Sequence, residues 1–167
     1  MSKARTGIFA AAITPLKKDG TPDLVKLAHY CSRILDEGLT GVAPAGTTGE
    51  GISMPFESRL EMPEHFSNLG INSDRVIFGT GACACDDAAH LTKACLAAGY
   101  SNALVLPPFF FKEPTQEGIY SYYARLIDKI GDGRLRLYLY HFPQMSKVAI
   151  EIALIQRLKS EFGEIIA

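Results

Sequence analysis

Residues 75–107 read RVIFGTGACACDDAAHLTKACLAAGYSNALVLP, and this stretch contains one complete strand–helix–strand unit. The apolar run at residues 75–81 is followed by Asp86 and Asp87, which suit the first turn of a helix, and Gly99 suits its end. A second apolar run closes the stretch. Both runs are almost continuously apolar, which is typical of parallel strands covered on both faces. The stretch therefore predicts a βαβ unit with its helix outside a parallel sheet.

The same pattern repeats along the chain. Strand starts fall about thirty residues apart, which is the length of one βα unit. Each of the first five apolar runs is followed by a segment with helical periodicity. Besides residues 75–81, the predicted strands are residues 8–14, 41–46, 102–107, 135–142 and, cut short at the last residue, 164–167.

Capping signals set the predicted helix ends. In the first helix, Thr21 is the expected N-cap, Pro22 occupies the first helical position, and Gly38 ends the helix. In the fourth, Thr115 is the expected N-cap and Gly131 the stop.

The repeat predicts an α/β fold, either a doubly wound sheet or a (β/α)₈ TIM barrel. A barrel needs about 250 residues, and these 167 residues supply about five βα units and the start of strand six. The chain stops inside a strand-like run. We therefore expect a single partial domain over residues 1–167, with the C-terminal part of the protein missing.

Composition excludes several classes of protein. Seventeen basic and 18 acidic side chains give a net charge of −1, so nothing favours binding to nucleic acid or anionic lipid. No stretch has the roughly 20 apolar residues of a membrane span. Residues 1–5 and the apolar run after them resemble a signal peptide, but Pro15 closes that run and favours a buried strand. We expect a cytoplasmic protein.

The four cysteines predict neither a disulfide framework nor a metal site. Cys83 and Cys85 lack a second pair at metal-ligand spacing, so packing is the expected role of all four thiols. The full set is Cys31, Cys83, Cys85 and Cys95.

Functional side chains gather where barrel strands end. Strand two ends in Gly46-Thr47-Thr48-Gly49-Glu50, where glycines allow a tight turn with successive N–H groups beside two hydroxyls. Such a nest suits a small anion such as a carboxylate. The alternative is a glycine-rich turn with capping hydroxyls.

Tyr140 ends strand five, where its phenol could give and take a proton, although a satisfied core tyrosine fits the position equally well. Alternation along the strand sends His141 to the opposite face, so a structural histidine is favoured.

Together these residues resemble the dihydrodipicolinate synthase / N-acetylneuraminate lyase family over essentially the whole chain. The matching signals, in order and in register, are Thr14-Pro15, residues 46–50, Gly79-Thr80-Gly81-Ala82, Pro107-Pro108 with aromatics, Pro114-Thr115-Gln116-Glu117-Gly118 and Tyr140-His141-Phe142-Pro143.

The resemblance implies a class I aldolase or lyase. In such enzymes a lysine ending strand six forms a Schiff base with pyruvate or another 2-keto acid, and no cofactor is needed. By the match, Thr47 and Thr48, with Gly49, hold the keto-acid carboxylate, and Tyr140 shuttles the proton with Thr47 beside it. The lysine itself is absent, because the chain stops at Ala167. Lys112 and Lys147 lie in loops on the catalytic face, but neither ends a strand.

Together with the absent lysine, further departures argue against genuine dihydrodipicolinate synthesis. Phe111 stands where those synthases carry a tyrosine of a proton relay, and phenylalanine cannot pass a proton. Residues 144–147 replace an arginine that meets the second substrate's carboxylate, and His141 replaces an asparagine.

We therefore expect an enzyme that joins or separates a 2-keto acid and an unknown aldehyde, or eliminates water, and that forms a tetramer or dimer. The alternative is a non-catalytic protein that binds keto acids or assembles with another chain.

Overall fold

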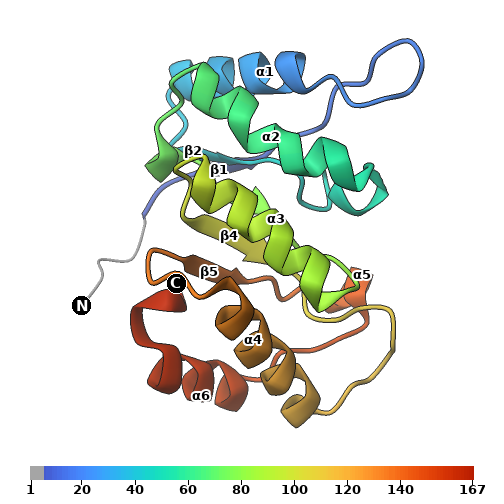
Figure 1. Ribbon diagram of the computed structural model, residues 1–167, viewed down its shortest axis with the longest axis vertical. Coiled ribbons are helices and arrows are strands. Elements are labelled where there is room, and N and C mark those ends of the chain that lie inside the picture. The colour runs from blue at the N-terminus through green and yellow to red at the C-terminus, as the bar shows by residue number, and fades with distance from the viewer. Residues whose placement is uncertain (1–5) are drawn as a thin grey trace.

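The computed structural model describes residues 6–167 as alternating strands and helices (Figure 1). Residues 1–5, the start of the segment weighed as a signal peptide, lie outside the described residues. The strands are β1 (Phe9–Ala11), β2 (Gly41–Ala43), β3 (Phe78–Gly79), β4 (Asn102–Val105) and β5 (Arg136–Leu139). The helices are α1 (Leu24–Asp36), α2 (Phe56–Asn68), α3 (Cys85–Ala97), α4 (Gln116–Ile130), α5 (Pro143–Ser146) and α6 (Ile152–Phe162), with 3₁₀ turns η1 (Gly51–Ser53), η2 (Ser73–Arg75) and η3 (Gly163–Ile165).

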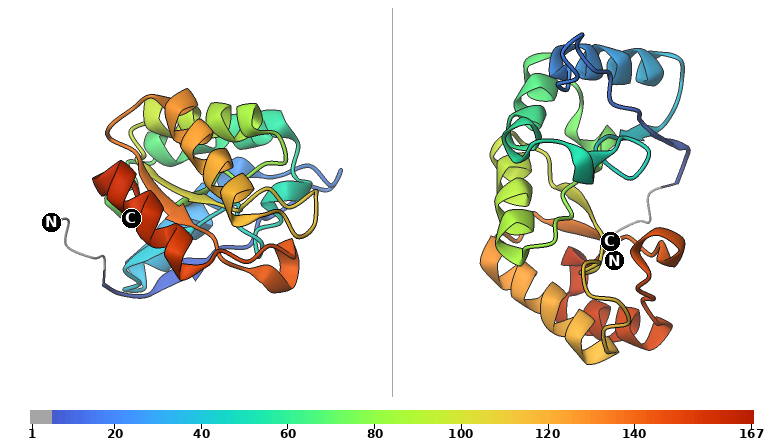
Figure 2. Two further views of the ribbon diagram at one scale, coloured as in Figure 1. Left: turned by 90° about the horizontal axis from the view of Figure 1, so that it is seen from below. Right: turned by 90° about the vertical axis from the view of Figure 1, so that its right-hand side faces the viewer.

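All strand pairs are parallel and follow chain order. β1 pairs with β2, and β3, β4 and β5 form a second ladder. A parallel bridge between Val42 and Val76 joins the two ladders, and another between Leu137 and Ile166 begins a sixth position. The longer helices, α1 to α4 and α6, lie along the outer side of this curved sheet (Figure 2), whereas the four-residue α5 follows the carboxyl end of β5. This arrangement confirms the predicted partial (β/α)₈ barrel.

Two hydrophobic clusters fix the helices to the sheet. One lies under α1 and α2 and centres on Leu27, Val42 and Phe66, which are fully buried. The other lies under α3, α4 and α6 and includes Val105 and Leu137, also fully buried. Burial of apolar area at about 25 cal/mol per Å² is the main term that holds these helices in place.

Helix ends agree with the sequence in α4 and differ in α1. The Thr115 hydroxyl accepts the N–H of Gly118 at 3.1 Å, and Gly131 ends α4 in the left-handed conformation. The prediction that Thr21 caps α1 is wrong. Asp23 is the N-cap and accepts the N–H of Lys26 at 3.0 Å, while the Thr21 hydroxyl donates to Asp19 at 2.7 Å. A carboxylate adjacent to the first turn displaces the more distant threonine.

The strands are shorter than predicted. The sixth run is a strand only at its end, because η3 occupies residues 163–165 and the bridge to Leu137 forms at Ile166. β4 is mostly buried, whereas Ala11 at the end of β1 is exposed, as are Ile8 (73%) and Ile13 (54%) on either side of that strand. The prediction of strands covered on both faces therefore fails at β1, where Phe9 and Ala10 are half-buried and Ala11 is exposed.

Over the described part of the chain, no helix has both the length and the apolar character needed to cross a membrane.

Candidate functional site

The turn at residues 46–50 connects β2 to η1 and faces the carboxyl end of the sheet. Two of its own hydrogen bonds close it, from the N–H of Glu50 to the carbonyl of Thr47 and from the N–H of Gly51 to that of Gly46, each at 3.1 Å. Within residues 6–167, no carbonyl accepts the N–H groups of Thr47, Thr48 or Gly49. The turn can therefore offer several backbone donors to a small anion.

Gly49 of this turn and Gly79 beside it allow close packing, and neither has a left-handed backbone conformation. The left-handed positions are taken by Ala45 (φ 56°) and Glu50 (φ 52°). A Cβ on Gly49 would lie 2.7 Å from the carbonyl oxygen of Ala12, and one on Gly79 would lie 2.1 Å from that of Ala45. Glycine is thus required where neighbouring strand ends approach the turn.

Thr14, which follows β1, holds the turn through a side-chain hydrogen bond. Its hydroxyl donates to the carbonyl of Gly49 at 2.6 Å. This hydrogen bond explains why a threonine is useful at the end of the first predicted strand, because its hydroxyl fixes the conformation of the turn.

Tyr140 and Thr47 meet although 93 positions separate them. The Tyr140 hydroxyl donates to the Thr47 hydroxyl at 3.1 Å, and both residues are half-buried. The N–H of Tyr140 donates to the carbonyl of Val105 at 3.0 Å, and its ring stacks on Phe142 with centroids 5.9 Å apart. The phenol is therefore fixed beside the turn and can exchange a proton with a bound molecule through a short path. Thr48 is exposed and Gly49 buried in the same turn.

Arg59 of α2 is a buried cation that the sequence did not single out. It is 8% exposed, and its Nη2 donates to the carbonyls of Gly79 at 3.1 Å and Gly81 at 2.8 Å. Burial lowers the pKa of its guanidinium, and its Nε has no partner among the described residues. Arg59 ties the end of β3 to the helix that follows the Thr47 turn. The only sequence signal for this role of Arg59 is the presence of an arginine within the segment predicted as the second helix.

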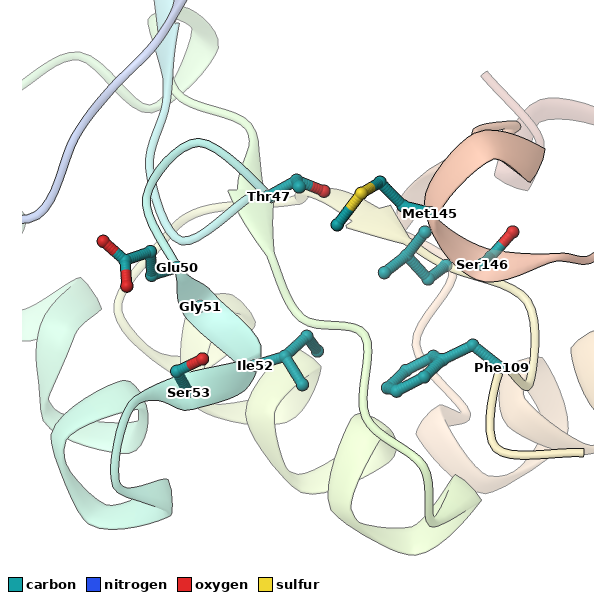
Figure 3. Close-up of a pocket in the computed structure, with 9 residues that line it drawn as sticks. Thr47, Glu50, Gly51, Ile52, Ser53, Phe109, Met145 and Ser146 are labelled. Carbon is teal, nitrogen blue, oxygen red and sulfur yellow. The ribbon is translucent and has the colours of Figure 1, made fainter.

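A cavity of about 340 Å³ opens beside Thr47 (Figure 3). The 3₁₀ turn η1, the loop after β4 and the short helix α5 line it, through Thr47, Glu50, Gly51, Ile52, Ser53, Leu106, Phe109, Met145 and Ser146. In Figure 3, Ile52 and Phe109 point toward each other, and the side chain of Met145 extends toward Thr47. The volume lies in the range of small-molecule sites.

The other predicted residues lie outside the Thr47–Tyr140 pair. The Nδ1 of His141 accepts the N–H of Ile150 at 3.1 Å, which is a structural role. Phe111 is 76% exposed and packs edge-on against Phe110. Lys147 is exposed, and Lys112 donates to the carbonyl of Phe109.

The prediction that all four cysteines are packing residues is wrong for Cys83, which is exposed because it lies in the loop before α3 rather than on a helix face. Within residues 6–167, no three His, Cys, Asp or Glu side chains gather in a way that could hold a metal ion.

Comparison with known proteins gives one consistent result. The sequence model described as the dihydrodipicolinate synthetase family matches residues 4–167. A Chloroflexus aurantiacus protein named as an uncharacterized DapA-like lyase is 37% identical over 162 residues, which cover 94% of this chain and 52% of that protein.

Two solved structures show the same likeness in three dimensions. The dihydrodipicolinate synthase of Agrobacterium tumefaciens has a TM-score of 0.90 and 32% identity, covering 97% of this chain and 56% of that one. The chloride-inhibited synthase of Acinetobacter baumannii, solved with pyruvate, has a TM-score of 0.80 and 30% identity, covering 91% and 51%. The chain thus spans about half the length of the relatives it matches.

Proposed function

Because the chain belongs to the dihydrodipicolinate synthetase family, we propose that it supplies the keto-acid-binding half of a Schiff-base-forming lyase or aldolase. The substrate class is pyruvate or another 2-keto acid. The relative from Acinetobacter baumannii was solved with pyruvate, which supports this choice.

One observation carries the proposal, namely the 3.1 Å hydrogen bond between the hydroxyls of Tyr140 and Thr47 beside a turn with free N–H groups. A keto acid needs an anion site for its carboxylate and a proton donor or acceptor near its carbonyl carbon. The turn offers the first and Tyr140 the second.

In the proposed reaction, a lysine outside these 167 residues supplies the amine that condenses with the ketone, releasing water and leaving an iminium that accepts electrons. Thr47 and Thr48, with the N–H of Gly49, hold the carboxylate. Tyr140 passes a proton through the Thr47 hydroxyl. Phe111 lacks a hydroxyl and takes no part in proton transfer.

We further propose that the reaction is not dihydrodipicolinate synthesis. Met145, in the segment that follows Pro143, presents a thioether to the cavity, and no arginine lines it within the described residues. We also propose a cytoplasmic homo-oligomer, a tetramer or a dimer.

A second candidate function is non-catalytic, either keto-acid binding without turnover or assembly with another chain. Among the described residues, the second edge of β1 has no partner strand, and this edge together with the exposed Ile8 and Ile13 favours such assembly.

Intact mass spectrometry after incubation with pyruvate and borohydride tests the proposal. A full-length protein well above 18.2 kDa that gains one reduced pyruvate adduct supports a Schiff-base enzyme. A protein of 18.2 kDa without an adduct would favour the non-catalytic candidate instead.

A further inference from the structure

The cavity beside Thr47 is directly connected to the proposed keto-acid site. Thr47 lines the cavity and also accepts the hydrogen bond of Tyr140. A molecule whose carboxylate occupies the residue 46–50 turn would therefore extend the rest of its carbon chain into this space. The chemistry of the cavity wall then decides which carbon chains fit.

Four apolar side chains line the cavity, those of Ile52, Leu106, Phe109 and Met145, and all four are partly exposed. Ile52 is 46% exposed, Met145 is 60% exposed, and Phe109 is half-buried. They come from η1, α5 and the loop after β4, and in Figure 3 they converge on one space. When an apolar ligand displaces the water between exposed apolar groups, apolar surface is buried and the free energy of the complex falls.

Among residues 6–167, no positively charged side chain lines the cavity to compensate a second carboxylate. The lining residues include no lysine, arginine or histidine, and their one ionisable side chain is Glu50, which is acidic. In Figure 3 the Glu50 carboxylate points away from Phe109 and Met145. The nearby Lys112 binds the carbonyl of Phe109, and Lys147 follows the cavity wall in sequence without lining it. A carboxylate that left water for this wall would lose hydration without gaining a counter-charge.

We propose that the enzyme acts on 2-keto acids whose remaining chain is uncharged and apolar, held between Ile52, Phe109 and Met145. This inference rests on the proposed Schiff-base function and names the substrate class of the same site. It excludes dicarboxylic keto acids as preferred substrates.

A matched pair of ligands tests the proposal with the full-length protein. The two six-carbon acids 2-oxohexanoate and 2-oxoadipate differ only in a second carboxylate at the far end. Each is titrated in the presence of cyanoborohydride, and the reduced adduct is measured by intact mass. We expect half-saturation at a concentration at least about tenfold lower for 2-oxohexanoate. Equal half-saturation, or a lower value for 2-oxoadipate, would overturn the proposal.

Two variants test whether Met145 contacts the far end of the ligand chain. Met145→Arg places a cation in the cavity and should reduce the preference or reverse it. Gln144→Arg adds the same charge one residue earlier, at an exposed position that does not line the cavity, and should leave the ratio unchanged. An equal effect of both variants would overturn the assignment of Met145. Incubation with pyruvate distinguishes failure of the proposed function from failure of this inference. If pyruvate forms no adduct, the proposed Schiff-base function is wrong. If pyruvate forms an adduct but 2-oxoadipate is preferred over 2-oxohexanoate, only this inference is wrong.

Discussion

Two hydroxyl groups face each other at 3.1 Å in the proposed site, on Tyr140 and Thr47. Their positions follow from the fold, because parallel strands bring the carboxyl ends of β2 and β5 to the same side of the sheet. The sequence alone could place each residue at a strand end. It could not show that the two side chains touch, since that distance depends on the curvature of the sheet between them.

Tyr140→Phe removes the phenolic proton and keeps the ring that stacks on Phe142. In the full-length protein we expect turnover to fall by about 10²–10⁴, the usual contribution of general acid–base catalysis. Steady-state kinetics gives the value, and Tyr120→Phe, which makes the same change on α4 outside the proposed site, is the control. Unchanged turnover would remove Tyr140 from the mechanism.

Burial divides the four thiols into reactive and unreactive groups. Burial raises the pKa of Cys31 and of Cys95 to about 12, and it also raises the pKa of Cys85. The thiolate is the reactive form, so these three thiols stay protonated near neutral pH. Cys83 is exposed.

We therefore expect iodoacetamide at about pH 8 to label Cys83 first and to reach Cys31 and Cys95 only after unfolding. Peptide mass spectrometry measures the order. Labelling of Cys95 as fast as Cys83 in the folded protein would contradict the burial of α3 against the sheet.

At the scale of elements, Arg59 connects α2 to the end of β3. The two carbonyls that it binds, of Gly79 and Gly81, belong to the strand end that packs against Ala45 at the start of the proposed anion turn. A single buried side chain thereby ties the helix to the strand end against which Ala45 packs. Sequence patterns could not reveal this, because an arginine on an amphipathic helix is usually a solvated charge.

Arg59→Met keeps most of the side-chain volume and removes both hydrogen bonds. We expect the free energy of unfolding to fall by about 1.5–3 kcal/mol, the range for hydrogen bonds to charged groups, as measured by urea denaturation. Arg33→Met is the matched control, because Arg33 pairs with Glu37 at the surface with 80% of its side chain exposed. That change should cost at most about 0.5 kcal/mol. Equal losses in both variants would show that Arg59 has no special role.

Most element boundaries followed from local chemistry. Gly131 and Thr115 ended and began α4 as predicted, because a left-handed glycine and a hydroxyl cap act within one turn. The errors arose where several groups competed. Asp23 displaced Thr21 as the cap of α1, and η3 replaced most of the predicted sixth strand. The first choice was between two local capping groups two residues apart, whereas the second depended on the bridge between Ile166 and Leu137, which a periodic pattern does not contain.

At the scale of the molecule, the described residues form an arc rather than a closed barrel (Figure 2). The strand order runs from β1 to β5 and continues to Ile166, so β1 has a free edge within the described residues. Ile8 and Ile13 flank this edge, with exposures of 73% and 54%. An apolar, unpaired strand edge is a template for pairing with another chain.

The 167-residue polypeptide, produced by itself, should therefore self-associate through β1. We expect sedimentation of a species heavier than 18.2 kDa and a shift toward the monomer in the double variant Ile8→Lys and Ile13→Lys, because charges on an edge strand oppose pairing. Ile152→Lys is the control, since Ile152 is equally exposed (74%) but begins helix α6. A monomeric parent polypeptide, or an equal shift in the control, would mean that the edge of β1 does not drive association. Suppression of self-association by a separately produced C-terminal half would instead identify this edge as the surface on which the barrel closes.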